Sequence, residues 1–199
     1  MIPTIIFRRA APLYESMLQR PVDFVMPPEA VFKRKINLLE RRWKKQGPSI
    51  LKELSKITKL QWPEKDIVCY VTAGIPASFS HPLTLKLYED DDVMFDVVAH
   101  ELIHRLLNTP QNRSILRRSK AIILKPYHKE TNNMQQHIIV HAILTHILLR
   151  FFGPDRLKKA EQQSKSADYI NAWKVVDSIG YRAIIHELEK GRKVTLPPT

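Results

Sequence analysis

The feature that most constrains this chain is the segment from Val93 to Leu107, whose apolar residues recur at the spacing of an amphipathic helix. Three aspartates, Asp90 to Asp92, precede it, and Asn108-Thr109-Pro110 follows it, as is typical of the start and the end of a helix. Within it stands His100-Glu101-Leu102-Ile103-His104. Residues four apart on a helix lie on one face, one turn from each other. The sequence therefore predicts a helix that presents two imidazoles side by side.

This His-Glu-x-x-His spacing is that of a metal site. Two neutral imidazoles can bind one Zn²⁺ at about 2.0–2.1 Å, and a site with three protein ligands leaves a fourth position for water. Zinc lowers the pKa of that water to about 7, and Glu101 can take its proton as hydroxide attacks a carbonyl. The alternative is chance placement, but burying these polar groups beside an apolar stripe would be costly without a partner. We predict His100 and His104 as zinc ligands and Glu101 as the general base.

A third protein ligand is expected from the next predicted helix, which begins near residue 131 or 132 and ends at 152. Glu130, His137 and His141 are spaced by seven and by four residues, which places them on one helical face. We favour His141, which lies deepest in the apolar run, where a neutral imidazole most needs a partner. His137 could be the ligand instead, or could orient one or stabilise an oxyanion. Tyr127, which precedes this helix, could also reach an oxyanion. Glu130 would complete a His-His-Glu site.

The predicted fold class is α+β. Helical spacing and the break at Pro48 predict one helix over 29–46 and another over 49–60. Residues 67–72 and 83–88 are predicted strands, and the alternation of the second is that of an edge strand. Residues 167–179 and 181–190 are predicted to form one or two C-terminal helices around Gly180. We expect a small antiparallel or mixed sheet early in the chain and a helix-rich second half packed on it.

The charge of the chain is strongly positive: 199 residues include 32 Lys and Arg but 20 Asp and Glu, for a net charge of +12. Such a charge attracts acidic surfaces or phosphate backbones. The alternative function is therefore a basic nucleic-acid-binding or partner-binding protein whose metal is structural or absent. The basic residues, however, form scattered clusters that are more typical of solvated helix faces. These clusters are Lys33-Arg34-Lys35, Arg41-Arg42 with Lys44-Lys45, Arg117-Arg118 with Lys120, and Lys190 with Arg192-Lys193.

The compartment is predicted from the single cysteine and the apolar segments. Cys69 lies in an apolar run, where a thiol behaves as a small buried hydrophobe, and a lone cysteine fits a reducing compartment. The first residues lack the pattern of a secretory signal. The longest apolar segment, 138–152, is interrupted by polar residues and is shorter than the roughly 20 residues of a membrane span. We expect a soluble, cytoplasmic protein.

Residues Val97 to His104, the helix 137–144, and Ala172-Trp173-Lys174-Val175-Val176 with Gly180 resemble the zincins. In particular, the chain resembles the small soluble gluzincin-type peptidases called minigluzincins, which are similar to the catalytic domains of integral-membrane metallopeptidases. The resemblance implies a zincin fold, one zinc ion, Glu101 as base, and a peptide or protein substrate bound along strand 83–88. The family pattern has a glutamate as third ligand and an uncharged residue where Arg105 stands.

The resemblance also implies a division of the chain. It spans roughly residues 66 to 190. Residues 63–199 would form a zincin-like catalytic domain, and residues 1–62 an N-terminal helical segment that covers the site or acts as a lid. The sequence thus predicts a zinc metallopeptidase, with the four remaining histidines outside the site because none has a ligand partner at a diagnostic spacing. These are His81, His128, His146 and His186.

Overall fold

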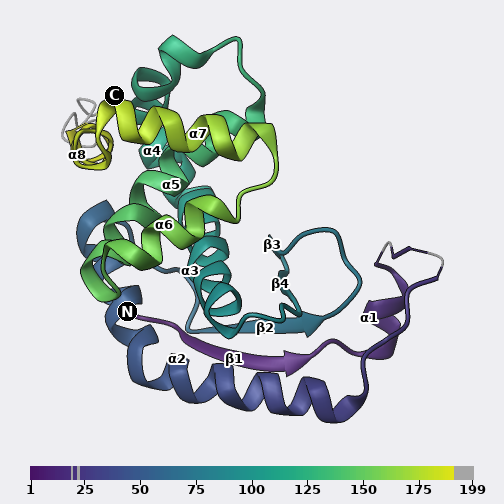
Figure 1. The fold of residues 1–199 in the computed structure, drawn as a ribbon. Coiled ribbons are helices and arrows are strands. Elements are labelled where there is room, and N and C mark those ends of the chain that lie inside the picture. Colours follow the sequence, from purple (N-terminus) through teal and green to yellow (C-terminus); the bar gives the residue numbers. More distant parts are fainter. Residues whose placement is uncertain (19, 22, 191–199) are drawn as a thin grey trace. The chain divides into compact units, whose positions relative to one another are not determined.

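A computed structural model describes residues 1–18, 20–21 and 23–190 (Figure 1). The chain divides into two compact units. Unit 1 consists of Met1–Lys52 and Trp62–Arg105, and unit 2 of Glu53–Gln61 and Leu106–Thr199. Arg192 and Lys193, which belong to the last predicted basic cluster, lie outside the described residues.

Unit 1 is built on a four-stranded mixed sheet with the strand order β1-β2-β4-β3. β1 (Thr4–Arg9) pairs in parallel with β2 (Asp66–Thr72), and β2 pairs in parallel with β4 (Leu83–Lys86). β3 (Phe79–Ser80) is antiparallel to β4. The mixed sheet and its two predicted strands are confirmed, whereas β1 was not predicted.

The prediction that 83–88 is an edge strand is wrong. β4 has β2 on one side and β3 on the other. Its alternation of apolar and polar residues does not reflect a solvated edge, because Leu83, Thr84 and Leu85 are all buried. The short β3 folds back through His81 and Pro82 and occupies the remaining edge of β4. Two residues of β3 were too few to be recognised from their sequence pattern.

Unit 1 contains the helix α1 (Pro12–Ser16) and most of two longer helices, α2 (Glu29–Thr58) and α3 (Asp91–Asn108). Residues 29–52 of α2 and 91–105 of α3 belong to this unit. α2 is a single helix of 30 residues, so the predicted break at Pro48 is wrong. Proline removes one backbone donor from a helix. Here the helix continues because Trp43 before the proline and Ile50 after it are both buried.

Aromatic rings join three elements in the core of unit 1. The ring of Trp43 in α2 lies 6.1 Å from that of Phe7 in β1 and 5.3 Å from that of Phe95 in α3, measured between centroids. Gly47 lies against the same indole, and a Cβ at that position would collide with it. Cys69 of β2 is fully buried and has no disulfide partner, as predicted. The sheet and both helices therefore share one core.

In its described residues, unit 2 is helical. It contains α4 (Pro110–Leu124), the 3₁₀ turn η1 (Lys125–Tyr127), α5 (Asn132–Phe151), α6 (Pro154–Gln162), α7 (Ala167–Ile179) and α8 (Tyr181–Lys190). α5 is buried over most of its length and packs against α6, α7 and α8. The predictions for α5, α7 and α8 are confirmed, whereas α4 and α6 were not predicted. The α+β class with a helix-rich C-terminal half is confirmed.

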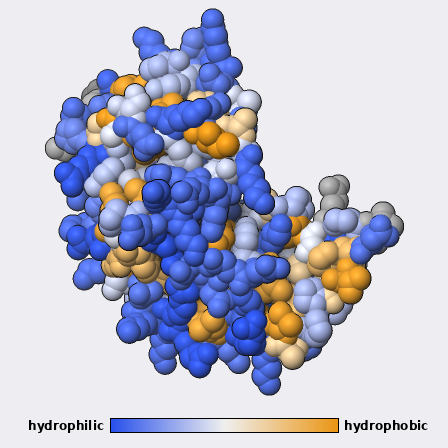
Figure 2. Space-filling view, in the orientation of Figure 1, coloured by the Kyte–Doolittle hydropathy of each residue, from blue (hydrophilic) through white to orange (hydrophobic). Residues whose placement is uncertain are grey.

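The surface is largely polar on the face drawn in Figure 2, with hydrophobic residues gathered around α1. Leu13, Met17 and Val25 are among the exposed large hydrophobic side chains. Among the described residues, no helix has the length and apolar content needed to cross a membrane. β1 places residues 4–9 in the sheet of unit 1. A covering role for residues 1–62 stays a prediction.

Candidate metal centre

The helix α3 carries the His-Glu-x-x-His sequence and is fixed at its start by a side-chain cap. The Oδ1 atom of Asp90 accepts hydrogen bonds from the backbone N–H groups of Asp92, at 2.8 Å, and of Val93, at 3.2 Å. A carboxylate at this place satisfies free amides and favours the positive end of the helix. The predicted acidic start of α3 is thereby confirmed. The buried side chains of Phe95 and Leu102 hold the helix in the core.

His100 and His104 present their Nε2 atoms to each other. The two atoms lie 3.2 Å apart, and both side chains are buried. Two nitrogen ligands of a tetrahedral zinc ion, each about 2.0–2.1 Å from the metal, are separated by about 3.3–3.4 Å. The pair therefore has the separation that one shared ion requires. Without a metal, the same distance is compatible with a hydrogen bond between the rings.

Glu101 is buried beside this pair. Burial raises the pKa of Glu101 to about 8. Burial also raises the pKa of Tyr88, and the negative charge of Glu101 adds to that shift, whereas a hydrogen bond with Ser78 opposes it. Tyr88 thus stands close enough to Glu101 to sense its charge. The sequence predicts Tyr88 only as the last residue of a strand, and nothing in the sequence around it indicates that it lies near Glu101.

Arg105, the residue at which the chain differs from the family pattern, makes contacts within unit 1. Its Nε and one terminal nitrogen lie 2.9 Å from Oε1 of Glu64, and its other terminal nitrogen donates to the main-chain oxygen of Ser80 at 2.8 Å. The guanidinium therefore joins α3 to the segments before β2 and at β3. A positive charge at this position has a structural explanation.

Unit 2 holds a second histidine pair, His137 and His141 on α5, whose ring centroids are 5.2 Å apart. Both are buried. Nδ1 of His137 lies 2.7 Å from the main-chain oxygen of Asn133, so Nδ1 carries the proton and Nε2 keeps its lone pair. Burial lowers the pKa of His137 more than this hydrogen bond and Asp168 raise it. The ring is thus held in the neutral form that binds metals.

Two aromatic residues of α7 support these histidines. The ring of Tyr169 lies 3.9 Å from that of His137, and the indole of Trp173 stacks on His141 at 4.0 Å with an angle of 12° between the planes. The sequence alone favours a core or interface position for both rings. One signal in the sequence indicates these contacts. The two histidines are four residues apart on α5, and the two aromatic residues are four apart on α7, so each set lies on one face of its helix.

Glu130 and Tyr127, the other residues predicted for the site, both lie before the start of α5. Glu130 is exposed and precedes Thr131, the N-cap of α5, so it is not on the helix. The predicted common helical face of Glu130, His137 and His141 is therefore wrong for Glu130. Tyr127 ends η1.

The four histidines expected outside the site have other surroundings. His146 lies 2.8 Å from Oε1 of Glu53, within unit 2. His128 lies 3.0 Å from the main-chain oxygen of Lys125, and His81 lies 3.1 Å from Oγ of Ser80. His186 is exposed.

No protein-family model, curated protein or solved structure matches this chain. The zincin resemblance therefore stays a prediction. The described residues include histidines that could hold a metal ion, among them the pair His100 and His104 of α3.

Proposed function

We propose that this protein binds one zinc ion through His100, His104 and His137 and hydrolyses peptide bonds. The observation that carries the proposal is the 3.2 Å separation of the Nε2 atoms of His100 and His104, which matches two ligands of one tetrahedral ion. Imidazole-rich sites of this kind usually hold zinc.

His137 is proposed as third ligand in preference to His141. A ligand imidazole typically donates its second N–H to a carbonyl, which fixes the ring and its tautomer. The Nδ1–H of His137 has such a partner in the main-chain oxygen of Asn133. The ring of His141 instead lies flat on Trp173. We assign His141 a packing role next to the ligand.

Glu101 is the proposed general base. A zinc ion at this place would polarise a substrate carbonyl and make a water molecule more acidic. Glu101 follows a ligand directly in the chain and is buried. A bound cation would favour its ionised form against the effect of burial, and the carboxylate could then accept a proton from water and return it to the leaving amine. A metal site with only a structural role would have no use for such a base.

The test of the ligand set is the zinc content of the purified protein and four variants. We expect about one zinc ion per chain in the wild type, as a single three-histidine site requires. His100→Ala and His137→Ala should lose it, whereas His141→Ala should retain it. His128→Ala, an exposed histidine of a turn, is the matched control. A wild type that binds no divalent ion even after reconstitution would refute the metal site.

The test of the chemistry is Glu101→Gln. We expect this variant to keep its zinc but to lose about 10²–10⁴-fold in the rate of peptide hydrolysis, the usual contribution of a general base. Cleavage would be followed by mass spectrometry of a peptide mixture. A Glu101→Gln variant as active as the wild type would remove Glu101 from the reaction. A zinc-loaded wild type that cleaves no peptide would overturn the peptidase proposal and leave the metal site standing.

A second function, binding to nucleic acid, is supported by α4. This helix has four positively charged residues and no acidic one, namely Arg113, Arg117, Arg118 and Lys120. None of them forms an ion pair with another residue in the described part of the chain. Cations one turn apart can contact successive phosphates, and such binding weakens steeply with salt. Titration of a DNA duplex at two salt concentrations, with Arg113→Gln/Arg117→Gln as the variant, tests this function.

A further inference from the structure

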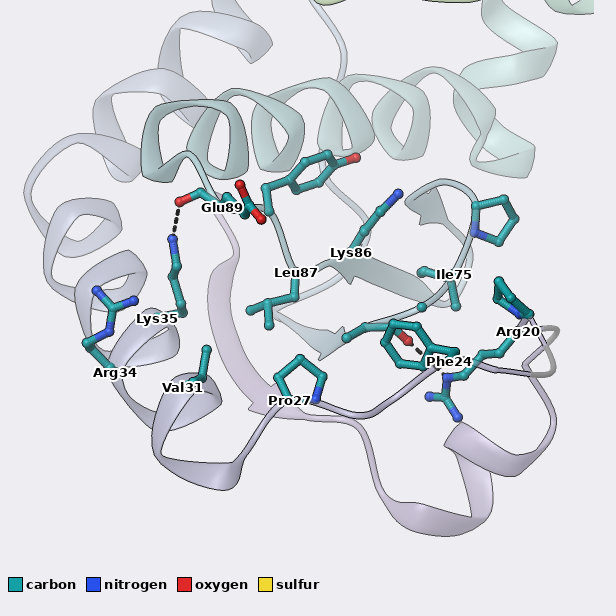
Figure 3. A pocket seen from close by; sticks show the side chains of 15 residues that line it. Arg20, Phe24, Pro27, Val31, Arg34, Lys35, Ile75, Lys86, Leu87 and Glu89 are labelled. Atoms are coloured by element: carbon teal, nitrogen blue, oxygen red, sulfur yellow. Dashed lines mark hydrogen bonds between the residues drawn. The ribbon is translucent and has the colours of Figure 1, made fainter.

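A cavity of about 820 Å³ lies in unit 1, beyond the carboxyl ends of β2 and β4 (Figure 3). Pockets that hold small ligands usually measure about 300–1,000 Å³. The region outside the carboxyl ends of neighbouring parallel strands is also a frequent place for ligands. The proposed zinc chemistry gives this cavity no role.

The wall of the cavity is mainly apolar. Phe24 and Ile75 lie next to each other in Figure 3, and Leu87 lines the cavity to their left. Gly74 has a φ of +77°, and a Cβ there would collide with the ring of Phe24. The glycine thus allows the Phe24 ring to lie directly on the main chain that follows β2. An apolar chain placed here would be removed from water, which is favourable.

Two of the cations at the cavity are engaged within the protein. Arg20 donates to the main-chain oxygen of Ala73 and to Oγ1 of Thr72, each at 2.9 Å. The ammonium of Lys35 contacts the main-chain oxygen of Glu89 and lies 2.6 Å from Oδ1 of Asp91. These charges are neutralised or hydrogen-bonded and are not available to a ligand.

The other two cations are available. Neither the ammonium of Lys86 nor the guanidinium of Arg34 forms a hydrogen bond or an ion pair with any residue that the structure describes. Arg34 is exposed, so water screens its charge, whereas Lys86 is half-buried between the buried Leu85 and the half-buried Leu87. A half-buried ammonium gains most from a direct anionic partner. Lys86 is therefore the place where a ligand's negative charge would be bound.

We propose that this cavity binds a carboxylate carried on an apolar chain, with the carboxylate on Lys86 and the chain on the apolar wall. One ammonium suits a single carboxylate, whereas a phosphate usually takes several donors or a forked guanidinium. The carboxylate of Glu89 also lines the cavity and disfavours a ligand with more negative charge. Two sources share this chemistry: a fatty acid and the carboxyl terminus of an apolar peptide.

The experiment is calorimetric titration of the 199-residue chain carrying Glu101→Gln, so that a peptide is not consumed. One pair of probes is decanoate and decanamide, and the other is acetyl-Leu-Leu-Phe with a free or an amidated carboxyl terminus. In at least one pair, the carboxylate should bind about tenfold more tightly than the amide, the effect of one charge-assisted hydrogen bond. The pair that shows the difference identifies the source. Equal binding of acid and amide in both pairs, or no binding, overturns the proposal.

Two variants locate the binding. Lys86→Gln should abolish the preference for the carboxylate, and Val31→Asp, on the half-exposed part of the wall, should weaken both members of the pair at least tenfold. Lys44→Gln removes an exposed charge of α2 that does not line the cavity and is the matched control. A preference that survives Lys86→Gln would refute the assigned cation. Because no probe is hydrolysed, the result is independent of the zinc chemistry.

Discussion

The imidazole of His137 donates from Nδ1 to the main-chain oxygen of Asn133, 2.7 Å away and one turn earlier in α5. The acceptor is a backbone atom, so a substitution of the Asn133 side chain does not remove it. That side chain instead donates to Oδ2 of Asp168 in α7 at 2.9 Å. The orientation of His137 is thus set by the helix itself, and the ring is further held by Tyr169.

The first prediction concerns this support by Tyr169. Tyr169→Ala removes the ring that lies 3.9 Å from His137 and should lower zinc affinity about 10–100-fold, the usual effect of losing a group that orients a ligand. Tyr169→Phe keeps the ring and should bind zinc as the wild type does. Competition with a zinc chelator measures both. If Tyr169→Phe loses as much affinity as Tyr169→Ala, the hydroxyl rather than the ring acts on the site.

The second prediction concerns the pH dependence of stability through Glu53. Burial raises the pKa of Glu53, but the hydrogen bond with His146 and the charges of Arg150 and Lys56 outweigh burial, and the pKa lies below the usual value. A carboxyl whose pKa is lower in the folded state stabilises the fold above its unfolded pKa. That stabilisation is lost as the pH falls through the folded value.

Thermal unfolding from about pH 7 down to about pH 3 tests this effect. Glu53→Gln should lower the melting temperature at neutral pH, and the difference from the wild type should shrink toward acid pH. Glu40→Gln, an exposed carboxylate of α2, should show little difference at either end. A difference between Glu53→Gln and wild type that grows on acidification would contradict the assigned sign.

The third prediction concerns Gly47. In an exposed helix, replacing glycine by alanine stabilises by about 1 kcal/mol. Here the added Cβ would meet the buried indole of Trp43, so Gly47→Ala should destabilise by about 1–3 kcal/mol. Urea unfolding gives the free energy, and Lys45→Ala, exposed on the same helix, should change it by less than about 0.5 kcal/mol. A stabilised Gly47→Ala would show that Trp43 moves aside without strain.

The fourth prediction concerns Arg105, whose planar group contacts Glu64 and the main-chain oxygen of Ser80. Arg105→Ala should lower the free energy of unfolding by about 1–3 kcal/mol, because a half-buried, charge-assisted network is lost. Arg105→Lys should recover only part of it, since one ammonium cannot match the forked geometry. Arg118→Ala, on an exposed face of α4, is the control. Full recovery by lysine would mean that only the charge matters.

The helix of the candidate site could be predicted because its determinants are local. The aspartates at its start, its apolar period and Pro110 after its end all lie within about one helix length of His100. The same holds for α7 and α8 around Gly180. The choice between His137 and His141 has no such local determinant, because both are buried histidines one turn apart on α5. Which of them is better suited to bind a metal depends on the tertiary surroundings of each ring.

α4, α6 and β1 are elements that the sequence pattern does not predict, and the reason differs between the two helices and the strand. α4 begins at Pro110 and α6 at Pro154, and a proline at the start of a helix breaks no hydrogen bond, because an N–H there would have no partner within the helix. β1 was missed because its partner β2 is far away in sequence, and a strand without a neighbouring hairpin partner gives a weak pattern.

The parallel pairing of β1 with β2 also bears on the order in which unit 1 can assemble. Thr4 pairs with Asp66, so the sheet closes a loop of about 60 residues that contains the whole of α2. Contacts this distant in sequence form slowly, whereas a helix forms within about a microsecond. During synthesis, the first strand must therefore wait without a partner until its neighbour has left the ribosome, and the long helix between them is the element able to form in the meantime.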